Sequence, residues 1–170
     1  MLSALLQRDP FPWQQRLFAQ FVAGKIPSAL DLPTGTGKTL VIAIWLAALA
    51  TQALQGKLTL PRRLVYIVNR RTIVDQATTE TERLLKRLQT PELAKARSAL
   101  QKLAAIPSEN PVTASTLRGE LADNGEWKAD PARPAIVLGT VDMVLSKLLF
   151  RGYGDGKRKR VIHAGLLGHD

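Results

Sequence analysis

The chain has 170 residues, no cysteine and a formal net charge of +10. This length fits one domain with a substantial core, and the lack of cysteine excludes disulfides, cysteine-ligated zinc and thiol nucleophiles. The longest apolar run, residues 40–50, is too short to cross a bilayer, and the chain does not open on a signal-peptide pattern. We therefore expect a cytoplasmic protein without a membrane partner. The basic excess favours a polyanionic partner such as nucleic acid, with a merely solvated basic surface as the alternative.

The first predicted elements are a helix over residues 10–24, a short strand over residues 28–31 and a helix that ends near residue 53. Trp13 and Phe21 mark the apolar face of the first helix, and Gly24 is a suitable residue to end it. The second helix begins with an unbroken apolar run, which predicts burial on nearly all sides.

Residues 31–39 read Asp-Leu-Pro-Thr-Gly-Thr-Gly-Lys-Thr and connect the predicted strand to the buried helix. A strand, a glycine-rich turn and a helix in that order form a phosphate cradle, because Gly35 and Gly37 let successive backbone N–H groups point inward. Lys38 would reach the β- and γ-phosphates, and the Thr39 hydroxyl would bind Mg²⁺. The strict P-loop pattern requires glycine where this stretch has leucine, so a chance Gly-Lys-Thr turn is the alternative. We expect nucleotide phosphate binding.

The remainder of the chain alternates predicted strands and helices. The strands cover residues 64–68, 112–116 and 135–139, the helices cover residues 72–88, 91–105 and 140–150, and an irregular excursion covers residues 119–134. This alternation predicts an α/β fold with a mostly parallel sheet and helices on both faces. Ligands bind at the carboxyl ends of the strands in such sheets. The stretches that fall there are the P-loop and residues 69–71, 117–119 and 139–140.

Residues 32–39 resemble the first motif of superfamily two helicases, in which alanine or leucine often replaces the first glycine, as Leu32 does here. Residues 68–76 resemble helicase motif Ia, residues 115–119 the strand-end motif that follows it, and residues 139–142 the Gly-Thr motif. The resemblance implies a RecA-like P-loop NTPase lobe, the N-terminal ATP-binding domain of a helicase, over residues 1–170. It also implies ATP and Mg²⁺ as cofactors.

The resemblance also assigns the nucleotide site. Its residues are Pro33, Thr34, Gly35, Thr36, Gly37, Lys38 and Thr39, with Lys38 and Thr39 catalytic and Thr39 on Mg²⁺. Gln14, about 24 positions before Lys38, resembles the glutamine with which these helicases read adenine, and it fits the family spacing better than Gln15. An amide offers the donor and the acceptor that the N6 and N7 edge of adenine requires. A solvent-facing helix glutamine is the alternative.

The same resemblance implies a set of nucleic-acid contacts: Asn69, Arg70, Arg71, Arg118, Gly119 and Thr140. Arg70 is placed to pair with a backbone phosphate, and Thr140 can offer its hydroxyl and backbone N–H to another at a helix N-terminus. Contacts of this kind hold a strand without reading its bases, as a translocase requires. The alternatives are a solvated helix start for the two arginines and a plain N-cap for Thr140.

Within superfamily two, residues 127–134 and 148–154 resemble the CRISPR-associated helicase of type I systems. This implies translocation on single-stranded DNA in antiviral defence, with a CRISPR surveillance complex and a nuclease domain as partners. Other interpretations stay open: a superfamily two RNA helicase, a restriction-type translocase, or a nucleic-acid-binding or structural fragment without ATP turnover. A P-loop kinase or transporter ATPase is disfavoured, because a Gly-Thr motif and an upstream glutamine are both present.

The chain departs from the family pattern at its end. The family places an Asp-Glu-x-His strand soon after the Gly-Thr helix to hold Mg²⁺ and position the attacking water, and no Asp-Glu dipeptide occurs in these 170 residues. Asp142 is the nearest acid after a strand, but it already has a role as an acid at a helix N-terminus. We therefore expect a RecA-like lobe that is incomplete at its C-terminal end, truncated before that motif, and that binds ATP without hydrolysing it alone.

Overall fold

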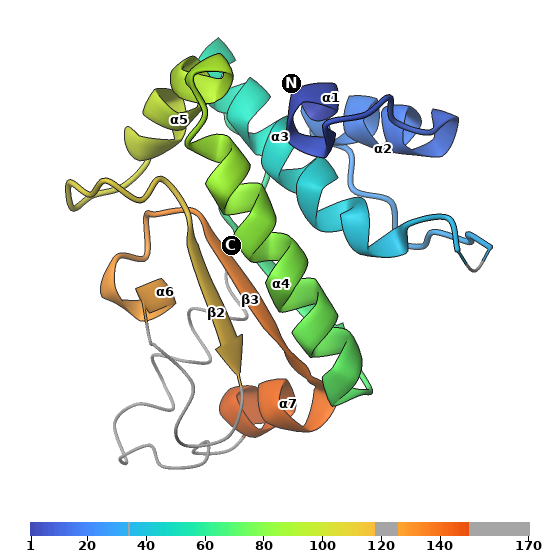
Figure 1. The fold of residues 1–170 in the computed structure, drawn as a ribbon. Helices are drawn as coiled ribbons and strands as arrows, with labels where there is room; N and C mark the ends of the chain where they lie inside the picture. Colours follow the sequence, from blue (N-terminus) through green and yellow to red (C-terminus); the bar gives the residue numbers. More distant parts are fainter. Residues whose placement is uncertain (34, 118–125, 150–170) are drawn as a thin grey trace.

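The computed structural model describes residues 1–33, 35–117 and 126–149. The strands of this part are β1 (Arg63–Val68), β2 (Thr113–Leu117) and β3 (Ala135–Thr140), which form one parallel sheet in the order β1-β3-β2 (Figure 1). Each coincides with a predicted strand to within one residue at either end. The parallel sheet predicted from the alternating elements is therefore confirmed.

The helices also follow the prediction, with one addition at the N-terminus. Their bounds are α1 (Leu2–Leu6), α2 (Pro12–Val22), η1 (Lys38–Leu40), α3 (Val41–Gln55), α4 (Arg71–Leu88), η2 (Pro91–Leu93), α5 (Ala94–Gln101), α6 (Glu126–Ala129) and α7 (Val141–Leu149). The sequence analysis did not predict α1, whose three leucines are buried in the main core. Gly24 ends α2 with a φ of 74°, as expected for a residue that closes a helix.

Strand β3 shows why the sheet has helices on both faces. All of its residues are buried, and they alternate between two hydrophobic cores. Ile136 and Leu138 belong to the larger core with α3 and α4, whereas Ala135 and Val137 belong to a smaller core with Val144 of α7. Because successive side chains of a strand point to opposite faces, a continuously apolar strand needs cover on both sides.

Helix α3 is the centre of the larger core. Its residues 42–50 are all buried, so the predicted all-round burial is confirmed. In the described part of the chain, the stretch Lys38–Gln55 is long and apolar enough to cross a membrane by length and composition alone. Here it packs against α1, α2 and α5 inside the fold, and that packing accounts for its apolar composition.

The strand predicted over residues 28–31 is wrong. These residues run as irregular chain, and Ala29 and Leu30 are exposed to solvent. A strand needs a hydrogen-bonded neighbour and an apolar face to bury. This stretch has only two apolar residues, and within the described sheet it pairs with no strand. The P-loop is therefore entered from a surface segment.

The excursion predicted for residues 119–134 is described from residue 126 onward, where Asp130 fixes a turn. The buried Asp130 carboxylate accepts the Ile106 and Ala132 N–H groups, each at 3.0 Å, and lies 3.8 Å from the Arg133 guanidinium. Burial acts to raise the pKa of Asp130, but the backbone N–H groups and the Arg133 charge outweigh it and lower the pKa overall. The turn ties the chain after α5 to the start of β3.

Candidate nucleotide and nucleic-acid site

The P-loop has the backbone that a phosphate cradle needs at its two glycines. Gly35 and Gly37 have φ values of 82° and 76°, which side chains rarely tolerate, and an added Cβ at Gly35 would meet nothing within 4 Å. The Thr36 hydroxyl donates to the Pro33 carbonyl at 2.7 Å and fixes the turn. Thr34 lies outside the described residues. The space around Gly35 on the side of its absent side chain is therefore open.

Lys38 and Thr39 stand where the loop becomes helical. Gly37 is the N-cap of η1, and η1 continues directly into α3, so the unpaired N–H groups of this helix start face the loop. Lys38 is exposed, and Thr39 is half-buried. An ammonium and a hydroxyl at a helix start fit the triphosphate and Mg²⁺ of the predicted cofactor.

Gln14 provides a second observation that fits a nucleotide. Its side chain is fully buried, and its Oε1 accepts the Phe11 N–H at 3.0 Å. Its Nε2 donor is buried and has no hydrogen-bond partner among the described residues. An added Cβ at Gly37 would lie 3.6 Å from this nitrogen, so the free donor stands beside the P-loop. Buried donors are nearly always paired in native proteins, and a bound base could supply the missing acceptor.

The neighbouring Gln15 is oriented differently. It is exposed, and its Nε2 donates to the Pro10 carbonyl at 3.0 Å. Of the two glutamines, only Gln14 is next to the P-loop, and the structure therefore places the residue preferred on family spacing beside the predicted phosphate site.

A cavity of about 510 Å³ lies between η1, which leads into α3, and the first turns of α4. It is lined by Thr39, Leu40, Asp75, Gln76, Thr79, Glu80 and Arg83. The sequence analysis did not single out Asp75, and no local spacing indicates it, because only the packing of α4 beside the start of the α3 segment brings Asp75 near Thr39. In the described part of the chain, no three metal-ligating side chains gather at one point. The predicted Mg²⁺ contact thus rests on Thr39.

The predicted nucleic-acid residues lie at the carboxyl ends of the strands. Val68 pairs with Thr140, so the chain that leaves β1 and the chain that leaves β3 are neighbours. Arg70 is the N-cap of α4 and Arg71 its first residue, while α7 begins directly after Thr140. The structure thus brings Asn69, Arg70, Arg71 and Thr140 to one edge of the sheet. Arg118 and Gly119 lie outside the described residues.

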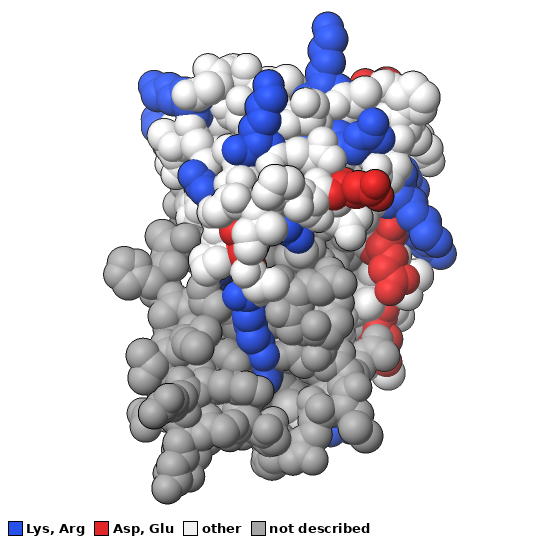
Figure 2. Space-filling model, turned by 90° about the vertical axis from the view of Figure 1, so that its left-hand side faces the viewer, with Lys and Arg blue, Asp and Glu red and all other residues white. Residues whose placement is uncertain are grey.

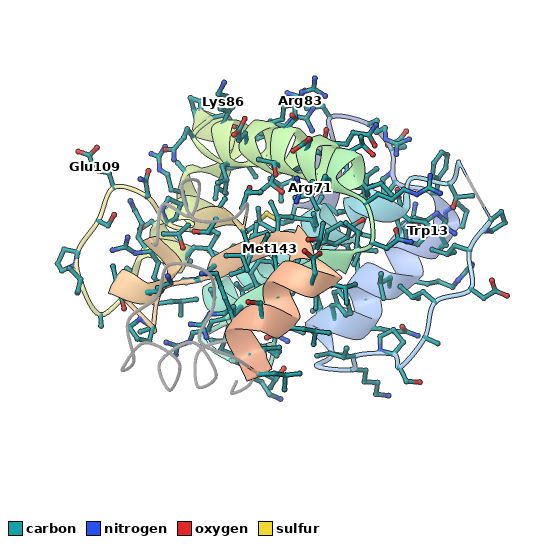
Figure 3. All side chains as sticks on the ribbon, turned by 90° about the horizontal axis from the view of Figure 1, so that it is seen from below. Trp13, Arg71, Arg83, Lys86, Glu109 and Met143 are labelled. Carbon is teal, nitrogen blue, oxygen red and sulfur yellow. The ribbon has the colours of Figure 1, made fainter. Side chains whose placement is uncertain are left out.

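Asp142 belongs to this edge of the sheet. The pKa of its carboxyl is lowered, first by a hydrogen bond from the Thr140 side chain, then by backbone N–H groups and by the charge of Arg71. Figure 3 shows Arg71 and Met143, the residue after Asp142, near each other in the view from below. The Thr140 hydroxyl therefore donates to Asp142, and the acid partly offsets the positive charge of this edge.

One comparison with known proteins gives a match, to the family described as type III restriction enzyme, res subunit, over residues 8–147. The chain belongs to this family. It is therefore of the superfamily two helicase type, and its sheet and helices are those of a RecA-like lobe. Proteins with this domain are ATP-dependent helicases or translocases and generally bind ATP with Mg²⁺. No curated protein and no solved structure matches the chain.

The matched span of this res-subunit domain contains both groups of residues described above. It begins before Gln14 and ends after Asp142, so the P-loop and the described strand-end residues lie inside it. The match extends to the helicase superfamily and adds nothing specific to the CRISPR-associated branch.

Basic side chains are spread over one side of the domain. Figure 2 shows separate Lys and Arg side chains distributed across this face, with acidic side chains mainly at one border. The Lys and Arg side chains of the described residues therefore do not form one compact patch on this face. Binding of a nucleic-acid strand would depend on places where a helix N-terminus and arginine side chains lie together, as they do at Arg70 and Arg71.

Proposed function

We propose that this chain is the ATP-binding lobe of an ATP-dependent DNA helicase or translocase that acts on single-stranded DNA. The observation that carries the nucleotide part is the buried, unpartnered Nε2 of Gln14 beside Gly37 of the P-loop. A donor that lacks a partner in the folded chain gains one when a purine base binds there.

The residues of the P-loop divide the work of holding the phosphates. Backbone N–H groups around Gly35 and Gly37 would surround the phosphate oxygens, and Lys38 would neutralise their charge. Thr39 would orient Mg²⁺, which neutralises charge on the phosphoryl oxygens when it is bound. Gln14 would hold the base, so the nucleotide would be gripped at both ends.

The residues at the carboxyl ends of the β-strands would bind the phosphate backbone of the nucleic acid. Arg70 and Arg71 stand at the start of α4, and Thr140 stands at the start of α7. Helix N-termini and arginines both favour phosphate, and neither reads base identity. This arrangement suits a protein that moves along a strand, because every nucleotide offers the same contact.

We further propose that the chain acts in type I CRISPR interference, in the cytoplasm, with a surveillance complex and a nuclease as partners. The support is the resemblance in residues 127–134 and 148–154. A second candidate is a nucleic-acid-binding part without turnover. It is favoured by one observation, the absence of an Asp-Glu dipeptide from the 170 residues.

Titration calorimetry with ATP and GTP tests the nucleotide proposal. We expect weak ATP binding that exceeds GTP binding, and loss of both in Lys38→Ala. Gln14→Ala should remove the preference for ATP, whereas Gln15→Ala is the matched control and should retain it. Equal affinity of the unmutated chain and Lys38→Ala would overturn the phosphate cradle, and equal affinity for ATP and GTP would overturn only the role of Gln14.

A further inference from the structure

A second buried glutamine, Gln52, joins α2 to α3. Helix α2 begins at the nucleotide end of the fold, where Gln14 adjoins Gly37, and its last turn lies against Gln52 near the end of α3 (Figure 1). A buried glutamine thus lies at each end of α2: Gln14 adjoins Gly37 at its start, and Gln52 contacts its last turn. At the nucleotide end the contact leaves a donor free, while at the far end every polar atom of the glutamine is used.

The far contact is built from hydrogen bonds on both sides of the Gln52 amide. Nε2 donates to the carbonyls of Phe21 and Val22 at 3.1 and 3.0 Å and to the Thr59 hydroxyl at 2.7 Å. Oε1 accepts the N–H groups of Thr59 and Leu60 at 2.8 and 2.9 Å. Gln52 is 1% exposed, so water does not compete for these bonds. We call this group, Gln52 with Phe21, Val22, Thr59 and Leu60, the Gln52 clamp.

The clamp acts on the part of α2 that needs partners. The last carbonyls of a helix lack intrahelical partners, and Gln52 donates to two of them on α2. One of the two, the Phe21 carbonyl, also accepts the Gly24 N–H at 2.9 Å. Gly24, just after α2, lies so close to Thr59 that an added Cβ would come within 2.5 Å of its hydroxyl oxygen. The end of α2 is therefore both held by Gln52 and pressed against Thr59.

We propose that Gln52 is a positioning residue for recognition of the nucleotide base. The clamp fixes α2 on α3 and so holds Gln14 beside Gly37, about 12 Å along α2 from the clamped carbonyls. Leu17 and Phe21 pack into the core between these points and help to place α2 on α3. The clamp adds directional hydrogen bonds to this packing at the end of α2. This inference rests on the proposed role of Gln14.

Two ligands separate base recognition from phosphate binding. ATP uses the P-loop and Gln14, whereas inorganic tripolyphosphate uses the P-loop alone. Gln52→Glu keeps an acceptor for Thr59 and Leu60 but loses the amide donors to α2. We expect its dissociation constant for ATP to rise about tenfold or more, because both hydrogen bonds to α2 are lost and an acceptor then faces the two carbonyls. Its dissociation constant for tripolyphosphate should stay unchanged.

Controls distinguish positioning from loss of stability. Val144→Ala opens the smaller core on the other face of the sheet, so it should lower the melting temperature without changing the ratio of the two affinities. In the double variant of Gln52→Glu with Gln14→Ala, ATP should bind as in Gln14→Ala alone, because the clamp acts through Gln14. If Gln52→Glu does not fold, Gly24→Ala would press against Thr59 of the clamp, displace the end of α2, and should give the same pattern.

Some outcomes would overturn the inference. It fails if Gln52→Glu weakens ATP and tripolyphosphate equally, if it leaves ATP binding unchanged, or if its effect adds to that of Gln14→Ala. A different result tests the proposed function itself: an unmutated chain that binds neither ligand would remove that function and this inference with it.

Discussion

The domain has two predicted sites. We call them the nucleotide side, which is Gln14 with the P-loop, and the strand side, where Arg70 and Arg71 would contact a nucleic-acid strand. They are built in different ways. On the nucleotide side, Gln14 and Gln52 are buried and form hydrogen bonds inside the fold. On the strand side, Arg70 and Arg71 are exposed at the start of α4, whose N-cap makes no side-chain bond. In the proposed function, recognition of a base would therefore be part of the core packing, whereas binding of a nucleic-acid strand would depend on surface charge. Substitutions should change folding and selectivity together on the first side, and salt-dependent affinity alone on the second.

The largest expected effect is that this chain binds ATP at the P-loop but does not hydrolyse it. Lys38 and Thr39 can hold a bound nucleotide, but these 170 residues contain no Asp-Glu pair, and an arginine finger supplied from elsewhere is worth about 10³–10⁵ in rate. We expect no detectable phosphate release from ATP by this chain at saturating single-stranded DNA.

Hydrolysis that DNA stimulates and that Lys38→Ala abolishes would contradict this expectation. Asp75 would then be the first acid to substitute, because it lines the cavity that contains Thr39. Asp142 lies on the strand side and has a hydrogen bond with the Thr140 side chain. It is therefore less suited to that role. Asp75→Asn with Asp142→Asn as its control would identify the acid.

The next largest effect is the difference in unfolding free energy between truncating a buried leucine and truncating an exposed one. Leu138 is fully buried in β3, and Leu149 is 56% exposed on α7. Leu138→Ala should lower the free energy of unfolding by about 2–5 kcal/mol, because it leaves a cavity in the core, whereas Leu149→Ala should change it by about 0.5 kcal/mol or less. Urea denaturation followed by circular dichroism measures both. Similar losses would show that the outer face of α7 is covered in solution.

A smaller effect concerns the strand side. Binding of single-stranded DNA should weaken linearly on a log–log plot against salt, and each phosphate contact contributes a slope of roughly −0.7. Arg70→Ala should flatten the slope by about that amount. Arg16→Ala is the matched control, since Arg16 is equally exposed but lies on α2, and it should leave the slope unchanged. A slope near zero for the unmutated chain would mean that the charge is only a solvated surface.

The smallest effect is a pH dependence far from both ligand sites. The pKa of Asp130 is lowered in the folded protein, so its carboxylate stabilises the fold above the ordinary value of 3.8 and loses this contribution as the pH falls through the folded pKa. The difference in unfolding free energy between the unmutated chain and Asp130→Asn should be constant from pH 7 to about pH 5 and shrink below about pH 4. A difference that persists unchanged at low pH would show that ionisation of Asp130 does not matter.

Local pattern accounts for most of the predicted elements. The continuous apolar runs at β1 and β3, the helical spacing in α2 and α4, and Gly24 at the end of α2 all specify structure through neighbours close in the sequence. The strand predicted at residues 28–31 shows the limit of this reasoning, since a strand exists only with a partner. Helix α1 was missed because five residues carry too little periodicity.

The sequence by itself determined the class of the fold, the P-loop and the edge of the sheet where the strand-end residues meet. These follow from periodicity, from glycine chemistry and from the rule that parallel strands end at one edge. Family spacing already favoured Gln14 over Gln15, but tertiary structure alone decided that the Gln14 side chain is buried beside Gly37, that Gln52 clamps α2, and that Asp75 lies near Thr39. Each depends on which helices pack together, over separations of up to about 36 residues along the chain. No local pattern encodes such pairings, because they arise only when the apolar faces of α2, α3 and α4 are buried together.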